Sequence, residues 1–397
     1  MKTPYYYISE TVLDEDVAVL RQLLRTHWKN AAVGYSVKTN SLPWLLSHLK
    51  GQGLRAEIVS DFEYEIARAA GFAPSQMIYN GPIKDAAVSD AILRAGGLVN
   101  LDSEKEIAHL ENSSPVGADA PVRRVGLRVN CDMHRLVPGE TSSGEETSRF
   151  GYCYEDGGLA DVIARLRKLP DVEICGLHLH CTTHTRSVAG FRALARFAGE
   201  LRDAFGLTLS YVDLGGGFWG GVPGRPDFRD YIPAIASELS RFFNPEATTL
   251  ILEPGVSLVS RCSSFVTTVR EVKRLRGEVF AVTDGGRVHL NPQVTRRRYP
   301  HHTVYLDHDR EIVPRQMICG YTCMEYDRLF EETDAPALRP GDRVVYDLAG
   351  GYTLCLAPQF IQGLPAVYIG KADGSVLTAR EAWGAAEYLQ KCRFETL

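Results

Sequence analysis

Apolar and polar positions along the first part of the chain follow a repeating order of strands and helices. Residues 31–37 form a short apolar run typical of a buried strand, and apolar residues recur at helical spacing through 11–28 before it. Further strands, separated by helical patterns, are expected at 55–60, 77–79, 98–101, 122–129, 173–180, 209–214 and 249–252. Strands that alternate with helices indicate a parallel α/β architecture, and the number of repeats predicts a (β/α)8 TIM barrel.

The pattern changes after about residue 261, where helical spacing becomes scarce. Short alternating strands are expected at 265–272, 279–283, 316–320, 343–346 and 366–369. This change predicts a second, mostly β domain, and the tyrosine-rich strand at 4–9 is expected to join it because a barrel does not need that strand. We therefore expect a barrel domain over 25–262 and a β-rich domain over 1–24 and 263–397.

Composition places the chain among ordinary globular proteins. Of its 397 residues 45% are hydrophobic and 23% charged, and the net charge of -5 argues against nucleic acid and membranes as partners. No stretch is long enough to span a membrane, and the start has no apolar signal region. Nine cysteines without CxxC spacing argue against a disulfide framework or a zinc site, so we expect a cytoplasmic protein without a metal site.

A lysine follows the first apolar run, in the stretch Tyr35-Ser36-Val37-Lys38-Thr39-Asn40. Burial at a strand end disfavours the ammonium form and lowers the pKa of a lysine. A neutral lysine amine attacks carbonyls and forms a Schiff base, which makes Lys38 a candidate catalytic residue. A surface lysine at the end of an ordinary strand is the competing interpretation, and this stretch alone favours neither.

Two further stretches fall where barrel strands are expected to end, which is where the active sites of this fold are built. His178 and His180 lie two apart on a strand and so face the same side; a pair of hydrogen-bonded core histidines is the alternative. Gly215, Gly216 and Gly217 expose backbone N–H groups, a typical cradle for a phosphate, although a simple turn has the same composition.

Three more candidates lie later in the chain. Glu253 places a carboxylate at a strand end, where a helix cap or a salt bridge is the alternative. In the β-rich part, Cys323 precedes Asp327 by four residues, and Tyr352 follows two glycines. Each of these signals is weak alone, but their order and spacing together are specific.

Taken together, these stretches resemble the fold-type III pyridoxal-phosphate-dependent decarboxylases, the group of diaminopimelate and ornithine decarboxylases, over nearly the whole chain. That family combines an alanine-racemase-like barrel with a C-terminal β domain. The resemblance implies pyridoxal 5'-phosphate as the cofactor, held by Lys38 as an aldimine, and a small-molecule amino acid as the substrate. It also implies a homodimer whose subunits share their active sites.

The resemblance assigns a role to each candidate residue and so predicts decarboxylation of an amino-acid-type substrate. His180 stacks on the cofactor ring, Glu253 pairs with the ring nitrogen, and Cys323 donates a proton to the α carbon. Asp327 belongs to the cysteine motif and, with Cys323 and Tyr352, contacts the substrate. The implied contacts to the cofactor, mostly to its phosphate, are Thr183, Gly215, Gly216, Gly217, Gly255 and Tyr352.

Departures from the family bear on the substrate. Val256 stands where the family has arginine, and Met324 stands where an acid meets the far end of the substrate. The segment after Gly286 lacks the diaminopimelate enzyme's Arg-Pro-x-Leu-Tyr. We therefore expect a substrate other than diaminopimelate or ornithine, such as a siderophore or natural-product precursor. The basic run 296–298 is a candidate contact for an acidic substrate tail or else a solvated loop, and the aperiodic polar stretch 131–148 is expected to be a loop.

Two other functions use the same residues. One is an amino-acid racemase or epimerase on the same fold, in which an arginine meets the ring nitrogen, and Glu253 argues against it. The other is a catalytically inactive pyridoxal-phosphate-binding homologue, which should lack Lys38 or Cys323, whereas both are present.

Overall fold

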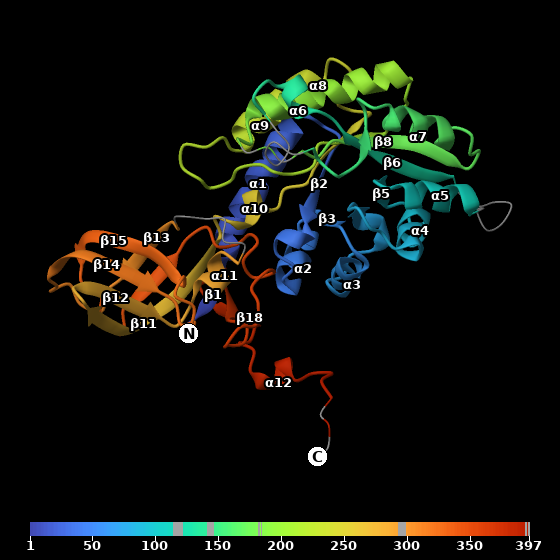
Figure 1. The fold of residues 1–397 in the computed structure, drawn as a ribbon. Coiled ribbons are helices and arrows are strands. Elements are labelled where there is room, and N and C mark those ends of the chain that lie inside the picture. Colours follow the sequence, from blue (N-terminus) through green and yellow to red (C-terminus); the bar gives the residue numbers. More distant parts are fainter. Residues whose placement is uncertain are drawn as a thin grey trace. The chain divides into compact units, whose positions relative to one another are not determined.

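The computed structural model describes residues 1–113, 122–140, 147–181, 183, 185–292, 299–393 and 395 (Figure 1). Its contacts divide the chain into two compact units, Val17–Ser257 and the combination of Met1–Asp16 with Leu258–Leu397. The divisions fall inside two helices, α1 (Glu10–His27) and α10 (Val256–Val259), whereas the sequence pattern predicts limits at residues 25 and 262.

Eight parallel strands close into a barrel in the unit Val17–Ser257, which confirms the predicted TIM barrel. Their order is β5-β4-β3-β2-β10-β9-β8-β6, and β5 pairs with β6 to complete the ring. A further short strand, β7 (Tyr152–Cys153), pairs alongside β6. The barrel strands are β2 Ala31–Ser36, β3 Arg55–Ile58, β4 Met77–Tyr79, β5 Leu98–Leu101, β6 Arg123–Asn130, β8 Val172–His178, β9 Tyr211–Asp213 and β10 Thr249–Leu252.

Helices alternate with these strands along the chain (Figure 1). They are α2 Pro43–Gly51, α3 Asp61–Ala69, α4 Ala86–Arg94, α5 Glu104–Asn112, α6 Met133–Leu136, α7 Gly158–Leu166, α8 Val188–Phe205 and α9 Phe228–Leu239. Polar caps begin several of them, and Ser60 accepts the N–H of Glu63 at the start of α3. The expectation of a loop throughout 131–148 is wrong at α6, because Asp132 caps a helical turn there by accepting the N–H of His134.

Tyr211 fills the middle of the barrel. A Cβ at Gly126 would lie 2.0 Å from the Tyr211 hydroxyl oxygen and one at Gly176 would lie 2.1 Å from its ring, so only glycine fits at these two positions. The hydroxyl donates to Asn100 Oδ1 at 2.6 Å. Asp213 lies two residues further along the same strand and therefore points the same way as Tyr211, toward the barrel axis. Tyr211 thus lies inside the barrel beneath the polar residues at the strand ends.

The second unit is built on one mixed sheet, which confirms the predicted mostly-β part of the fold. The sheet order is β15-β14-β12-β11-β1-β17-β18, and β16 pairs with β11 and β13. Strand β1 lies inside this sheet, antiparallel to β11 and parallel to β17. The elements are β1 Tyr5–Ser9, β11 Ser263–Leu275, β12 Glu278–Thr283, α11 Arg287–Leu290, β13 His301–Val304, β14 Ile312–Cys319, β15 Arg328–Pro336, β16 Arg343–Tyr346, β17 Ala366–Gly370, β18 Val376–Arg380 and α12 Ala385–Tyr388.

The sequence pattern missed strands β13, β15 and β18. In β15 the neighbouring residues Glu331 and Glu332 interrupt the alternation of apolar and polar positions. Their partners come from the adjacent strand β14, where Arg315 Nε lies 2.7 Å from Glu331 and Gln316 donates to Glu332 at 2.9 Å. Because these cross-strand pairs form only in the folded sheet, the strand cannot be recognised from its own residues.

Candidate active site

Lys38 lies in a 3-10 turn directly after strand β2. Its amine forms an ion pair with Glu57 of the neighbouring strand β3, and the Glu57 side chain is buried. The pairing follows from the barrel register, which sets Ser36 opposite Glu57. The Lys38 side chain itself is 36% exposed, so of the two interpretations left open by the sequence, an amine buried in apolar surroundings does not apply.

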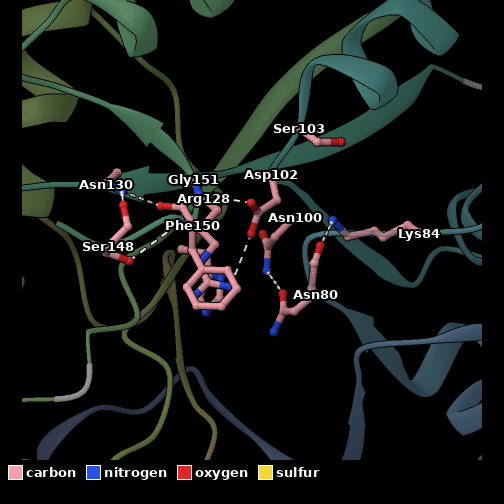
Figure 2. A network of polar contacts seen from close by, with 12 residues as sticks. Asn80, Lys84, Asn100, Asp102, Ser103, Arg128, Asn130, Ser148, Phe150 and Gly151 are labelled. Carbon is pink, nitrogen blue, oxygen red and sulfur yellow. Dashed lines mark hydrogen bonds and ion pairs between the residues drawn. The ribbon is translucent and has the colours of Figure 1, made fainter. Parts of the chain in front are cut away.

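A chain of buried hydrogen bonds runs from Glu57 to Glu253. Asn80, which follows β4, donates to Glu57 at 3.1 Å and to Glu253 at 2.7 Å. Its Oδ1 accepts from Asn100 at 2.8 Å, a contact drawn in Figure 2. Since buried polar groups are stable only when they are paired, Asn80 fixes the two carboxylates relative to each other and, through Glu57, to Lys38.

Glu253 directly follows strand β10 and is buried. Nε2 of His178 lies 3.4 Å from its Oε2. Burial by itself raises the pKa of a carboxyl, but the neighbouring His178 and Asp213 side chains outweigh burial and hold the pKa of Glu253 below its usual value. Glu253 is therefore a carboxylate at neutral pH and places a negative charge inside the barrel.

His180 presents a neutral ring. Its Nδ1 accepts the backbone N–H of Gly216 at 3.0 Å, which leaves Nε2 as the protonated nitrogen. Burial, followed by the charges of Arg128 and His178, lowers the pKa of His180 to about 3. A Cβ at Gly215 would lie 2.3 Å from the same Nδ1, so glycine is required for this close packing of loop and ring.

The glycine run after β9 uses two of its three N–H groups within the protein. Gly215 donates to Asp213 Oδ1 at 2.8 Å, and Gly216 donates to His180. Gly217 adopts a φ of 95°, in the left-handed region. No acceptor among the described residues takes the Gly217 N–H, which therefore stays available to a ligand.

Two further predicted cofactor contacts are built into the same unit. Thr183 is buried, and its hydroxyl oxygen accepts the backbone N–H of Arg186 at 3.0 Å. A Cβ at Gly255 would lie 2.1 Å from Thr39 Oγ1. Gly255 thus lets the turn after Glu253 pack against the turn that carries Lys38.

Arg128, near the end of β6, was not singled out in the sequence. Its Nη1 lies 3.2 Å from Asp102 Oδ2, and Asp102 Oδ1 accepts the N–H of Gly151 at 3.0 Å. Figure 2 shows Arg128 beside the Phe150 ring, whose centroid is 4.4 Å from the guanidinium carbon. The guanidinium of Arg149 lies 4.3 Å from the same centroid.

These groups surround one cavity of about 300 Å³ at the strand ends. Lys38, Glu57, Arg128, His180 and Glu253 all line it. The barrel thus brings together residues from widely separated parts of the chain and gives the cavity an amine, a carboxylate and a neutral imidazole. Such a set can bind a carbonyl compound covalently and stabilise positive charge on it.

The remaining predicted residues lie in the β-rich unit. Cys323 is exposed on the turn between β14 and β15. Asp327 is buried, and its carboxylate accepts the N–H and hydroxyl of Thr322 and the N–H of Arg287. Asp327 therefore holds the cysteine turn in place. Tyr352 is 38% exposed and adopts a φ of 55°, a conformation that is strained for a residue other than glycine.

Sequence reasoning missed Glu57, Asn80, Arg128 and Asp213. Each is a polar residue at or next to the end of an apolar strand, which is the signal that would have found them. The basic run at 296–298, expected as a contact for an acidic substrate tail, lies outside the described residues.

Comparisons with known proteins identify the family of the chain. A family model described as the pyridoxal-dependent decarboxylase, pyridoxal binding domain, matches residues 15–260. The probable chloroplastic diaminopimelate decarboxylase of Oryza sativa is 30% identical and aligns over 98% of this chain and 79% of its own. The L-glutamyl-(BtrI acyl-carrier protein) decarboxylase of Niallia circulans is 27% identical over 100% of this chain and 94% of its own. The crystal structure of diaminopimelate decarboxylase from M. jannaschii superposes with a TM-score of 0.86 at 22% identity, covering 100% of this chain and 93% of that one.

The family model covers more than half of the chain and defines a class of enzymes with a pyridoxal-binding domain, and the superposition shows the barrel fold. Within that class, the chain belongs to the pyridoxal-dependent decarboxylases. It is a pyridoxal-phosphate-dependent amino-acid decarboxylase. No helix within the described ranges combines the length and the apolar character that crossing a membrane requires.

Proposed function

We propose that this enzyme removes the α-carboxylate of an amino-acid-type substrate and that Lys38 is the residue that holds pyridoxal phosphate. The observation that carries the proposal is that Lys38 and Glu253 line one cavity and are joined through Glu57 and Asn80. The residues fit the cofactor, because an amine, an ionised carboxylate and a neutral imidazole line a space of about 300 Å³. When bound, pyridoxal phosphate withdraws electrons from the bond that breaks at the α carbon.

Each residue around the cavity then has a defined task. Glu253 supplies the negative charge that keeps a ring nitrogen protonated, since an opposite charge favours the charged form. His180 supports the ring face without adding a charge of its own, because burial keeps it neutral. The free N–H of Gly217 is a donor for the phosphate. Arg128 supplies a guanidinium that its contact with Asp102 holds in place.

We further propose that Cys323 returns a proton to the α carbon as a general acid. Its exposed position on an ordered turn supports this role, and the hydrogen bonds of Asp327 keep that turn in one conformation. The enzyme is proposed to form a two-fold dimer in which Cys323 and Tyr352 of one subunit complete the site around Lys38 of the other. Backbone strain at Tyr352 is consistent with a functional position.

Replacing Glu253 with Gln is expected to reduce kcat by more than tenfold. The change keeps the shape of the side chain and removes its charge, and a tenfold loss corresponds to about 1.4 kcal/mol of transition-state stabilisation. Steady-state kinetics of the purified variant measure the effect. Glu200→Gln, an exposed change on α8, is the matched control and should leave kcat unaltered. If Glu253→Gln kept the parental kcat, a group other than Glu253 would have to pair with the ring nitrogen of the cofactor.

The substrate is proposed to differ from diaminopimelate, ornithine and lysine. Met324 carries no charge, so it cannot pair with an ammonium group at the far end of those substrates. Arg149 lines the cavity with a guanidinium and favours an anionic group on the substrate instead. One relative is named for an L-glutamyl group on a carrier protein, which shows that the family extends beyond diamino acids. Acidic amino-acid derivatives, including carboxylated siderophore and natural-product precursors, are therefore the first compounds to screen.

Turnover of ornithine, lysine and meso-diaminopimelate is expected to be poor, with kcat/KM below about 10⁴ M⁻¹s⁻¹ for each. Carbon dioxide release by the purified enzyme measures this directly and tests the proposed decarboxylation across the wider screen. The paired variant Met324→Asp restores an acid at this position and should raise kcat/KM for lysine. An ordinary catalytic efficiency of the parent with any of the three would contradict the substrate proposal.

The same screen separates decarboxylation from the two alternative functions. A racemase or epimerase would change the optical rotation of its substrate without releasing carbon dioxide. An inactive homologue would do neither while still binding the cofactor. Glu253, an ionised carboxylate in the barrel, supports the decarboxylase over a racemase that places arginine at the ring nitrogen.

A further inference from the structure

Three neighbouring strands end at one buried cluster of titratable side chains. His178 is the last residue of β8, Asp213 is the last residue of β9, and Glu253 directly follows β10. The register sets His178 opposite Asp213, and Asp213 opposite Ile251 on its other side. Polar atoms of the three side chains all lie within 4.8 Å of one another, and all three residues are buried. Asp213 occupies the central strand and is 0% exposed.

One carboxyl oxygen of Asp213 is buried without a donor in the described part of the chain, close to a second carboxyl group. Asp213 Oδ1 accepts the N–H of Gly215 at 2.8 Å, but no donor among the described residues reaches the buried Oδ2. A polar atom of Asp213 nevertheless lies within 4.8 Å of one of Glu253, and both residues are buried. Two ionised carboxylates that are buried this close together repel each other, and neither can donate a hydrogen bond, so a stable contact between them requires a proton on one of the two residues.

The surroundings place this proton on Asp213. Glu253 receives a hydrogen bond from Asn80 at 2.7 Å and faces His178, and both contacts favour its ionised form. Asp213 has one N–H donor and faces the negative charges of Glu253 and Glu57. Burial, and then the charge of the neighbouring Glu253, raise the pKa of Asp213 well above its usual value.

We propose that Asp213 is a positioning residue that stays a neutral carboxylic acid and donates its proton to Glu253. In this state one oxygen of Asp213 holds the glycine turn through Gly215, while the other holds Glu253 as a carboxylate in a fixed orientation. Asp213 thereby couples the loop proposed to bind the phosphate to the acid proposed to meet the ring nitrogen. The inference rests on the proposed role of Glu253.

Infrared difference spectroscopy of the holoenzyme at neutral pH tests the protonation state directly. The difference between the parent and Asp213→Asn should show the loss of one carboxylic acid C=O band and no loss of carboxylate bands. Asp161→Asn, an exposed change on α7, is the matched control and should lose only carboxylate bands. Loss of a carboxylate band in Asp213→Asn would overturn the proposal.

Cofactor affinity tests the positioning role. The amide of Asp213→Asn can donate to Glu253 and accept from Gly215, so its dissociation constant for pyridoxal phosphate should stay within about threefold of the parent. Asp213→Leu removes both hydrogen bonds and should weaken binding roughly ten- to hundredfold. If Asp213→Asn and Asp213→Leu weaken the binding of pyridoxal phosphate equally, the proposal is overturned. If Asp213→Leu does not fold, the cofactor affinity and the infrared spectrum of Asp213→Asn test the proposal on their own.

The pH dependence of unfolding gives an independent readout, because a merely structural hydrogen bond would not produce it. Glu253, His178, Glu57 and Tyr211 are the titratable groups that face Asp213. Above about pH 4 the unfolded state loses the Asp213 proton while the folded state keeps it up to its raised pKa. The folding equilibrium constant of the parent, relative to that of Asp213→Asn, should therefore fall about tenfold per pH unit in this window. A ratio that does not change with pH would overturn the proposal.

Failure of this inference differs from failure of the proposed function. If Glu253→Gln decarboxylates at the parental rate, the role of Glu253 toward the ring nitrogen is wrong, yet the acid band of Asp213 in the parent still stands. If the acid band is missing while Glu253→Gln is slow, only the role of Asp213 is wrong.

Discussion

Lys38→Ala is expected to purify without colour and to lose decarboxylase activity by at least about 10³-fold. Lys38 is the lysine that lines the cavity at the strand ends in the described part of the chain, so its removal takes away the amine proposed to bind the cofactor carbonyl. The parent should be yellow, and borohydride should remove its visible absorbance band. Absorbance spectra before and after borohydride, together with carbon dioxide release, measure both expectations.

Controls for this variant must separate lost chemistry from lost structure. Lys38→Ala leaves the buried carboxylate of Glu57 without its ion-pair partner, which by itself can destabilise the barrel. Lys38→Gln can still donate a hydrogen bond to Glu57 and should be equally colourless and inactive while folding normally by circular dichroism. Lys29→Ala removes an exposed lysine that pairs with Glu246 and should keep full colour and activity. If the parent protein were colourless and did not bind added pyridoxal phosphate, the proposed role of Lys38 in holding the cofactor would be contradicted.

Mixing two inactive variants, Lys38→Ala and Cys323→Ala, is expected to restore about a quarter of the parental activity. In a shared-site dimer, a mixed pair has one site with both defects and one site with neither. Random exchange makes about half of the dimers mixed, and each of these has one intact site out of two. The assay follows carbon dioxide release after incubation under conditions that allow subunit exchange.

Each variant taken alone through the same incubation should stay inactive. Cys392→Ala, which changes another exposed cysteine, should keep parental activity and show that the loss is specific to Cys323. If both residues acted from the same chain, every site in the mixture would retain one defect and no activity would return. A fully active monomer in light scattering at the assay concentration would also contradict the shared site.

The sequence alone determined the architecture and the cofactor chemistry of this protein. Alternating strands and helices predict the barrel because each element carries its own periodicity, 2 for a strand and 3.6 for a helix, within a few neighbouring residues. The stretches around Lys38, His180, the glycine run and Glu253 are local runs at strand ends, and their resemblance to a known family implied the cofactor.

Only the tertiary structure decided which further groups surround these residues. Glu57, Asn80, Arg128 and Asp213 are single polar residues on different strands, and they become neighbours of the predicted site residues when the barrel closes. The same closure pairs Lys38 with a carboxylate, which its own stretch could not decide. It also brings the buried carboxyl group of Asp213 within 4.8 Å of that of Glu253, which is the observation behind the proposed neutral state of Asp213. The physical reason is that pKa and ion pairing depend on distances across the barrel, which the local pattern of residues does not contain.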